Sequence, residues 1–248
     1  MIGWLIYSAV DVEKNKYYIQ MYKDKFKEHF IEIKLVIVEE LENMEQYVKC
    51  NKVDFAINRS RNHIMGELLE QKGVRVFNSS SVTRIANNKG ITYEFLKDVV
   101  PFLAVKYGNE IIESKIENKG FEYPYVIKSC SGHGGSQVFL VNNSKEDEQA
   151  VKAMNGQEYV VQQCCSDLGR DVRVYIIGNK IIKAVLRTST ESFKSNYSLG
   201  GKVQEYTLNN EEKAMVERIV DKLPLDYAGI DFTFNNGKAV FNEIEDAV

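Results

Sequence analysis

Three carboxylates near the end of the chain have the spacing of a metal site. Asp231 lies in the segment AGIDFTF, and Glu243 and Glu245 lie in FNEIED. If residues 235–237 form a three-residue hairpin loop, Asp231 opposes Phe241, and both glutamates continue on the face of Asp231. Like charges this close need a cation, and an all-oxygen set suits Mg²⁺ or Mn²⁺. A solvated acidic end of a sheet is the alternative interpretation.

A lysine followed by a glycine-rich segment has the chemistry of a phosphate site. In YVIKSCSGHGGSQV, Lys128 ends a buried-looking strand, and Gly132, Gly134 and Gly135 follow it. Glycines let backbone N–H groups approach phosphate oxygens, and the lysine adds a positive charge. The pattern is neither a Walker A loop nor GxGxxG, because no Gly-Lys-Ser/Thr follows and Gln137 takes the place of the third glycine. A flexible hairpin loop is the alternative.

Two arginines lie on a predicted strand pair, GRDVRVYIIGNKIIKAVLR. If residues 178–179 form a two-residue turn, Arg173 pairs near Ala184 and lies in the same cleft as Arg187. There the two guanidinium groups can bind phosphate or carboxylate oxygens. Surface ion pairs with Asp171 or Glu191 are the alternative.

The elements that must position these residues change in kind along the chain. Strands are predicted at 3–9, 31–38, 55–58 and 74–77, with helices at 15–29 and 64–71 between them, which indicates βαβ units and a parallel sheet. Later segments favour short strands and hairpins with helices at 81–87, 92–99, 145–154 and 211–223. The sequence therefore predicts an α/β lobe followed by two α+β lobes, with boundaries near residues 83 and 163.

Composition narrows the function classes. The 248 residues carry 32 basic and 35 acidic side chains, so nucleic-acid binding is not expected as the main function. No stretch approaches 18 apolar residues, which predicts that no segment spans a membrane. The four cysteines form no CxxC pair, as expected for a reduced, cytoplasmic protein.

Taken in order, these segments resemble the ATP-grasp superfamily, most closely its RimK-like carboxylate–amine ligases. The likeness begins at NSSSVTRIANNKGITYEFL and continues through the segments above, VVQQCC and FKSNYSLGG to the end of the chain. It implies an ATP-grasp architecture, α/β plus α+β, in which two α+β lobes clamp ATP. The expected domains are an N-terminal α/β lobe at 1–83, a central lobe with the glycine-rich loop at 84–163, and a C-terminal lobe with the metal site at 164–248.

The resemblance also implies roles for individual residues. The nucleotide would be bound by two lysines, the glycine-rich loop, an adenine-holding hinge and a few polar residues beyond it: Lys89, Lys128, Ser131, Gly134, Gly135, Gln163, Cys164, Cys165, Asp171 and Lys194. The transferring phosphoryl group would be held by Arg187, Asn196 and Arg173. Magnesium, or manganese in its place, would be held by Asp231, Glu243 and Glu245.

The implied reaction has two steps. ATP phosphorylates a substrate carboxylate to an acyl phosphate, and an amine on an amino acid, peptide or protein then displaces phosphate. Two alternatives stay open: a nucleotide-binding regulatory or partner module without turnover, and an ATP-grasp enzyme that phosphorylates a different acceptor. Dimers are common among relatives, so a homodimer is compatible with the resemblance.

Two residues depart from the family pattern, and two arginines are candidates for substrate binding. Glu245 stands where relatives usually have asparagine, and Gln163 replaces a commoner glutamate. Arg59 and Arg61 are candidates for anchoring an acidic substrate, with surface arginines on a solvated turn as the alternative.

Overall fold

The computed structural model describes residues 1–108, 120–135, 137–195 and 201–247. The chain divides into two compact units. The first comprises Met1–Arg84, Leu225–Tyr227 and Asp246–Val248, and the second comprises Ile85–Pro224 and Ala228–Glu245. The division of the second unit into two lobes at residue 163 stays a prediction.

The first unit is built on a parallel sheet of order β2-β1-β3-β4. This confirms the α/β character predicted from the alternation of strands and helices. The strands are β1 (Ile2–Tyr7), β2 (Glu32–Ile37), β3 (Phe55–Asn58) and β4 (Arg75–Phe77). The helical segments are α1 (Ala9–Val12), α2 (Lys16–Lys27), η1 (Val38–Glu40), α3 (Met44–Cys50), α4 (His63–Gln71) and α5 (Ser80–Ala86), the last of which runs across the boundary between the units.

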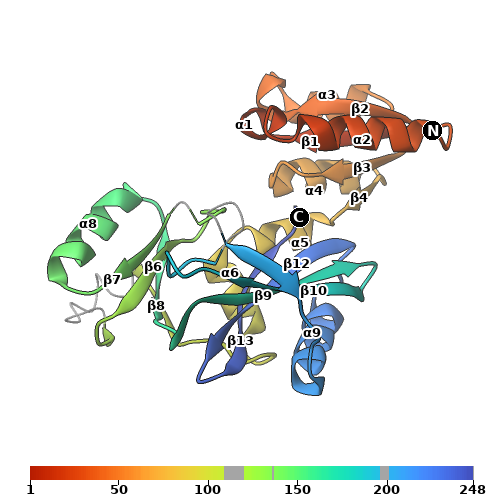
Figure 1. Cartoon of the computed structure of the whole chain (residues 1–248). Coiled ribbons are helices and arrows are strands. Elements are labelled where there is room, and N and C mark those ends of the chain that lie inside the picture. Colours follow the sequence, from red (N-terminus) through yellow and green to blue (C-terminus); the bar gives the residue numbers. More distant parts are fainter. Residues whose placement is uncertain (109–119, 136, 196–200, 248) are drawn as a thin grey trace. The chain divides into compact units, whose positions relative to one another are not determined.

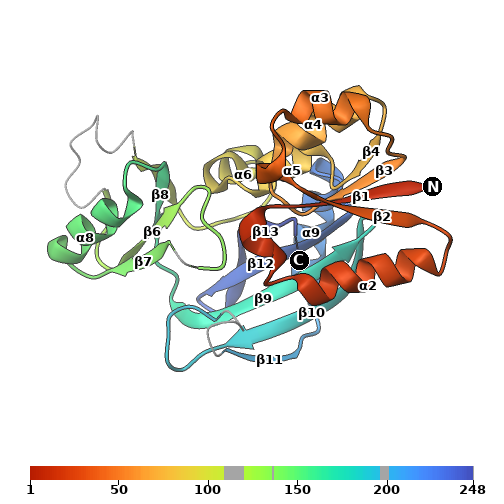
Figure 2. The same cartoon turned by 90° about the horizontal axis from the view of Figure 1, so that it is seen from above.

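Both faces of this sheet are covered, as parallel sheets require. Leu5 and Tyr7 pack with Ile19 of α2 on one face, whereas Trp4 packs with Met65 of α4 on the other. The alternation along β1 follows from the two-residue period of a strand. Figure 2 shows α2 on one side of the sheet and α3 and α4 on the opposite side.

The last residues of the chain belong to the first unit through one buried asparagine. The Asn78 Nδ2 donates to the carbonyl oxygens of Tyr227 at 2.7 Å and Asp246 at 3.0 Å, and its Oδ1 accepts from the Asp226 N–H at 2.9 Å. Because Asn78 is fully buried, these bonds satisfy polar groups that would otherwise be costly to bury.

The second unit contains two sheets (Figure 1). The first has the order β5-β8-β6-β7 and is antiparallel. Its strands are β5 (Val105–Tyr107), β6 (Tyr125–Ser129), β7 (Val138–Val141) and β8 (Tyr159–Gln163), with helices α6 (Lys89–Leu96) and α8 (Ser144–Met154). Met154 and Ala150 of α8 pack on Tyr125 and Ile127 of β6.

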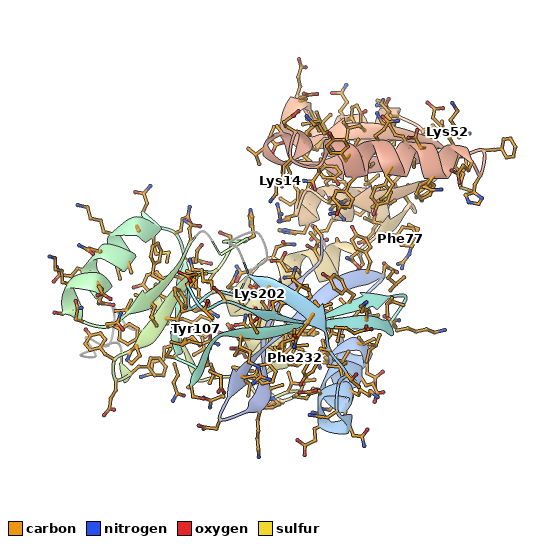
Figure 3. The ribbon with its side chains drawn as sticks, viewed as in Figure 1. Lys14, Lys52, Phe77, Tyr107, Lys202 and Phe232 are labelled. Atoms are coloured by element: carbon orange, nitrogen blue, oxygen red, sulfur yellow. The ribbon has the colours of Figure 1, made fainter. Side chains whose placement is uncertain are left out.

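The other sheet has the order β11-β10-β9-β12-β13. Its strands are β9 (Asp167–Ile177), β10 (Lys180–Thr188), β11 (Lys202–Glu205), β12 (Tyr227–Asn235) and β13 (Lys238–Glu245), with helix α9 (Asn210–Lys222) before β12. The buried rings of Phe232 and Phe241 meet edge to face inside it, and Phe232 is labelled in Figure 3. The sequence predicted neither β11 nor α3.

The register of the last hairpin differs from the prediction. Asn235 pairs with Lys238, so the loop has two residues, Asn236 and Gly237, both at positive φ as type I′ turns require. The pairing then shifts by one residue between Asp231 and Phe232, because Asn242 is an extra, bulged residue. Asp231 therefore lies directly opposite Glu243 and not opposite Phe241.

A second irregularity corrects the arginine strand pair. The register shifts between Ile181 and Lys183, so Arg173 pairs with Val185 and not with Ala184. The helix predicted at 92–99 also begins earlier, at Lys89, because the Asn88 side chain caps it by accepting from the Ile91 N–H. None of the helices in the described ranges is long and apolar enough to cross a membrane.

Candidate active site

One cavity in the second unit gathers most of the residues singled out from the sequence. Its lining includes Lys89, Lys128, Gly132, Gly135, Gln163, Cys165, Asp171, Arg187, Lys194 and Glu243. A smaller adjoining cavity shares Lys89 and Glu243 and adds Ser131 and Glu245. Of the other predicted residues, Cys164 lines a neighbouring cavity, Arg173 and Asp231 are joined to Arg187, and Gly134 lines none of these cavities. Asn196 lies outside the described residues.

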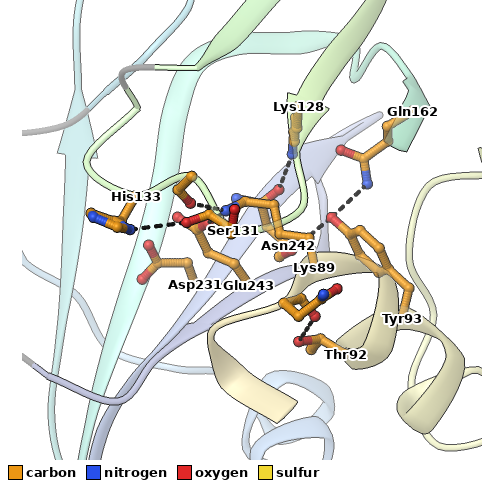
Figure 4. Close-up of polar contacts among 12 residues, drawn as sticks. Lys89, Thr92, Tyr93, Lys128, Ser131, His133, Gln162, Asp231, Asn242 and Glu243 are labelled. Carbon is orange, nitrogen blue, oxygen red and sulfur yellow. Dashed lines mark hydrogen bonds and ion pairs between the residues drawn. The ribbon is translucent and has the colours of Figure 1, made fainter. Parts of the chain in front are cut away.

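The two lysines enter the cavity from different elements. The capped start of α6 places Lys89 so that its Nζ donates to the Gly132 carbonyl at 2.5 Å and lies 3.5 Å from Glu243 Oε2. Lys128, at the end of β6, donates from Nζ to Asn242 Oδ1 at 2.8 Å. Figure 4 shows both ammonium groups beside Asn242 and Glu243 of β13. Burial of Lys128 lowers the pKa of its ammonium group to about 8.

Four charged side chains form a network on β9, β10 and β12, in which Arg187 and Asp231 are buried and Asp171 and Arg173 are partly buried. Arg173 binds both carboxylate oxygens of Asp231 at 2.7 Å, and Arg187 binds both oxygens of Asp171 at 2.6 and 2.8 Å. Arg187 Nη2 also donates to Asp231 Oδ2 at 2.7 Å, which joins the two pairs. Such bidentate pairs fix side-chain orientation as well as charge.

The carboxylates of this network differ in pKa for a simple reason. Burial raises the pKa of Asp231, but the charges of Arg173 and Arg187 outweigh it and hold the pKa below its ordinary value. Burial also raises the pKa of Asp171, and there the single guanidinium of Arg187 does not reverse the shift. Asp231 is thus the better-compensated anion, although it is fully buried.

Glu243 and Glu245 extend the acidic part of the site along β13. Burial first, and then the charge of Glu243, raise the pKa of Glu245 to about 7. Within the described ranges no three acidic, histidine or cysteine side chains lie close enough together to hold a metal ion. Three of the roughly four lone-pair sites of Asp231 accept from arginines, which leaves one on Oδ1. The paired carboxylates of Glu243 and Glu245 have the oxygen chemistry that a hard divalent cation prefers, but in this arrangement they do not form a three-carboxylate site with Asp231.

The hinge, which comprises Gln163 at the end of β8 and the following Cys164 and Cys165, combines backbone hydrogen bonding with an apolar wall. The Gln163 N–H donates to the Ala104 carbonyl at 2.9 Å, which ties the hinge to the segment before β5. The cavity beside it is lined by the apolar side chains of Leu103, Val126, Val138 and Leu168. Apolar walls with a few polar groups are typical of small-molecule sites.

A glycine supports the segment that carries Lys194. Gly169 has φ +66, and a Cβ there would lie 2.4 Å from the Ser189 carbonyl oxygen. Its backbone N–H donates to Phe193 and its carbonyl accepts from Ser189, so β9 holds the segment directly. The Lys194 Nζ then donates to the Gly135 carbonyl at 2.6 Å.

The sequence analysis did not identify Asn242, the hydrogen-bond partner of Lys128, or the two residues that hold it in place. Tyr93 donates from its hydroxyl to the Asn242 carbonyl at 2.8 Å, and Gln162 donates from Nε2 to that hydroxyl at 3.1 Å (Figure 4). Asn242 is the bulged residue of β13, and no local pattern distinguishes it from the acidic residues around it. Arg59 and Arg61, the candidates for anchoring an acidic substrate, both have polar partners within the first unit. Arg61 is paired with Asp11 at 2.6 Å, and Arg59 is buried and donates to the Ala247 carbonyl.

Comparison with known proteins agrees with this geometry. A protein of Mycoplasma pneumoniae, "Uncharacterized protein MG011 homolog", is 31% identical over 247 residues, which cover 98% of this chain and 83% of that protein. The "Probable alpha-L-glutamate ligase" of Haemophilus ducreyi is 25% identical over 172 residues, covering 66% of this chain and 56% of that protein. The crystal structure of a RimK domain ATP-grasp protein from Sphaerobacter thermophilus matches with a TM-score of 0.75 and 18% identity, covering 100% of this chain and 92% of that one. The family model for the RimK-like ATP-grasp domain matches residues 66–248, and the chain therefore belongs to the RimK-like ATP-grasp family.

Proposed function

We propose that the protein is an ATP-dependent carboxylate–amine ligase that forms an acyl phosphate and transfers the acyl group to an amine. One observation carries the proposal: a single cavity joins Lys89, Lys128 and Arg187 with the carboxylate of Glu243 and an apolar wall. Phosphoryl transfer depends mainly on charge neutralisation and positioning, and these residues supply both.

ATP would lie with its adenine ring against the apolar wall and the hinge, and with its phosphates toward the lysines. The hinge supplies Gln163, Cys164 and Cys165, and Asp171 also lines the cavity. Lys89 and Lys194 at present donate to carbonyls of the glycine-rich loop. Phosphate oxygens would compete for these ammonium groups, so Ser131, Gly134 and Gly135 would rearrange around the bound nucleotide.

A divalent cation, Mg²⁺ or Mn²⁺, would be held by Glu243 and Glu245 together with the remaining lone pair of Asp231. When bound, it would neutralise charge on the phosphates and polarise the transferring phosphoryl group. The proximity of Glu243 and Glu245 supports their part of this assignment, because the raised pKa of Glu245 reflects burial and the neighbouring charge of Glu243.

Arg187 is proposed to hold the transferring phosphoryl group. Asp171 and Asp231 orient its guanidinium, and Arg173 completes the charge balance around Asp231. Asn196 is proposed to assist Arg187. Closing of the loop around Gly134 would exclude water, which protects an acyl phosphate from hydrolysis.

A nucleotide-binding module without turnover is the second candidate, and one observation favours it. Both oxygens of Asp231 already accept from arginines, so this carboxylate has a structural role without any cation. In such a module Asp231→Asn would weaken folding but leave the magnesium dependence of nucleotide binding unchanged.

The ligase proposal is tested by trapping the intermediate. The protein is incubated with ATP, Mg²⁺, hydroxylamine and single carboxylic acids, beginning with glutamate because one relative is named a glutamate ligase. We expect a hydroxamate to form together with ADP and phosphate, and an amide to form when an amine replaces hydroxylamine. Nucleotide binding without hydroxamate across a broad acid library would contradict the ligase and favour the module.

A matched pair of variants distinguishes the loss of a cation ligand from an unspecific effect of replacing a glutamate. Glu243→Gln removes a proposed cation ligand and is expected to abolish hydroxamate formation. Glu205→Gln makes the same change on β11, where the side chain is 77% exposed and pairs with Lys183 at 3.6 Å. It should leave the yield unchanged, and an equal loss in both variants would contradict the assignment of Glu243.

A further inference from the structure

The four cysteines lie in three kinds of surroundings. Cys50 is exposed at the end of α3, and Cys130 is buried, which raises the pKa of its thiol. Cys164 and Cys165 are both partly exposed in the hinge after β8. Cys165 is the cysteine that lines the cavity containing Lys128, and both hinge cysteines line the neighbouring cavity.

The Cys165 sulfur has the surroundings of a stabilised thiolate. The neighbouring Cys164 thiol has the largest lowering effect on its pKa, and Thr233 Oγ1 donates a hydrogen bond to the sulfur at 3.3 Å. The charge of Lys128, across the same cavity, acts in the same direction. Together these groups lower the pKa of the Cys165 thiol despite its partial burial, and Cys164 and Lys128 are the titratable groups that face it.

Cys164 has the opposite character. Its interaction with Cys165, and then its burial, raise the pKa of the Cys164 thiol. A disulfide between the two is disfavoured, because adjacent Cα atoms are about 3.8 Å apart and disulfides need about 4.4–6.8 Å. Cys165 is the nucleophile of the pair, because it lines the cavity of Lys128 and accepts the hydrogen bond from Thr233.

We propose that Cys165 is a modification site for low-molecular-weight disulfides, and that the added group blocks the adenine end of the cavity. The Cys165 thiolate attacks one sulfur of the disulfide, a new S–S bond forms to Cys165, and the old S–S bond breaks. The departing thiolate takes a proton from water, and a thiol reductant reverses the exchange. The blocking part of this inference rests on the proposed nucleotide site, whereas the reactivity of Cys165 does not.

The reactivity is tested with dithiobis(nitrobenzoate), which releases a coloured thiolate for each modified cysteine. We expect a fast phase of one thiol in the native protein and in Cys50→Ser, and no fast phase in Cys165→Ser. The pH at which the fast phase reaches half its maximal rate should lie below that of Cys50, measured in Cys165→Ser. Thr233→Val, which keeps the side-chain shape and removes the donor, should move that midpoint upward.

Two results would contradict the proposed reactivity of Cys165. One is a fast phase that survives in Cys165→Ser. The other is a Cys165 midpoint equal to that of exposed Cys50, because the hydrogen bonds and Lys128 would then have no effect on the thiol.

Blocking is tested by protection with a nonhydrolysable ATP analogue and Mg²⁺. At an analogue concentration of 100 times Kd, the fast phase should slow by about 100-fold, the ratio of total to free protein. Protein modified at Cys165 should show no thermal shift with the analogue, and reduction should restore it.

The outcomes separate the two claims. A thermal shift of the native protein without protection would overturn the blocking and leave the nucleotide site intact. No thermal shift of the native protein would contradict both the proposed function and the blocking, and the reactivity of Cys165 would still be decided by its variants.

Discussion

Two parts of the active site hold their charged groups in opposite ways. Arg173, Arg187, Asp171 and Asp231 lie on strands and are joined by contacts of 2.6–2.8 Å. The loop at 131–135 is held in a different way. Lysines from other elements hold its carbonyl groups, and Gly134 and Gly135 have positive φ.

The difference indicates that the strand network and the loop have different roles in the proposed reaction. The strand-borne network has its geometry fixed before any ligand arrives, which is the condition for electrostatic stabilisation of a transition state. The loop depends on Lys89 and Lys194, whose ammonium groups are also the proposed phosphate ligands. Binding of phosphate is therefore expected to change the loop and leave the network in place.

The largest effect on the free energy of unfolding is expected from removing an arginine of the strand network. Arg173→Ala removes two of the three contacts to fully buried Asp231 and leaves a poorly compensated charge. Breaking a buried pair in this way costs about 3–5 kcal/mol in the free energy of unfolding, as measured by urea denaturation. Lys183→Ala, at an exposed ion pair on the same sheet, should cost no more than about 1 kcal/mol. Equal costs would show that the network is not preorganised by burial.

A smaller effect is expected at the glycine that joins the network strand to the Lys194 segment. Gly169→Ala places a Cβ 2.4 Å from the Ser189 carbonyl in addition to the strain of positive φ. Gly178→Ala is the matched control, because it has φ +54 and open space around it. The control should cost about 1–2 kcal/mol, and Gly169→Ala should cost more and also weaken ATP binding. Equal unfolding energies and ATP affinities would mean that the segment does not depend on β9.

The pH dependence of Lys128 tests the lysine side of the comparison. Burial lowers its pKa to about 8, so its charge is lost as pH rises through that value. ATP affinity should then fall by about fivefold between pH 8 and pH 9 if the charged form alone binds phosphate. Lys128→Arg keeps the charge and should remove this dependence, and a native affinity that is flat over this range would contradict the role of Lys128.

Stability should change in the opposite direction over the same range. The folded state holds fewer protons on Lys128 than the unfolded state between pH 8 and the ordinary lysine pKa, so this group raises the free energy of unfolding as pH rises. The contribution is the difference between native protein and Lys128→Met in urea denaturation at each pH. The free energy of unfolding of the native protein minus that of Lys128→Met should rise with pH. A fall of this quantity with rising pH would contradict the expected sign.

The smallest effect on stability is expected in the loop. Gly134 has φ +62 with no atom within 4 Å of the position that a Cβ would take, so Gly134→Ala adds backbone strain without a collision. We expect a cost at the low end of about 1–2 kcal/mol because a loop relaxes locally, and a lower yield of hydroxamate per ADP because water reaches the acyl phosphate. Gly156→Ala, with φ +78 in open space after α8, should leave that ratio unchanged. An unchanged ratio in Gly134→Ala would show that this residue has no part in excluding water.

The sequence alone determined the features that depend on local periodicity and on motif order. The alternation of strands and helices predicted the parallel sheet of the first unit, and the chain order of Lys89, Lys128, Arg187, Asp231 and Glu243 indicated the family. These signals survive in the sequence because side chains repeat every two residues along a strand and every 3.6 along a helix.

Tertiary structure decided the register and the pairing of charges. Because Asn242 is a bulged residue, Asp231 lies opposite Glu243. The side-chain amide of the same Asn242 accepts the hydrogen bond from Lys128. Arg173 contacts Asp231 across 58 residues of chain, and a contact of that kind arises only when β9 and β12 become neighbours in one sheet. Local patterns predict which strands form, but a single extra residue changes which side chains face each other, and only the packed sheet fixes that choice.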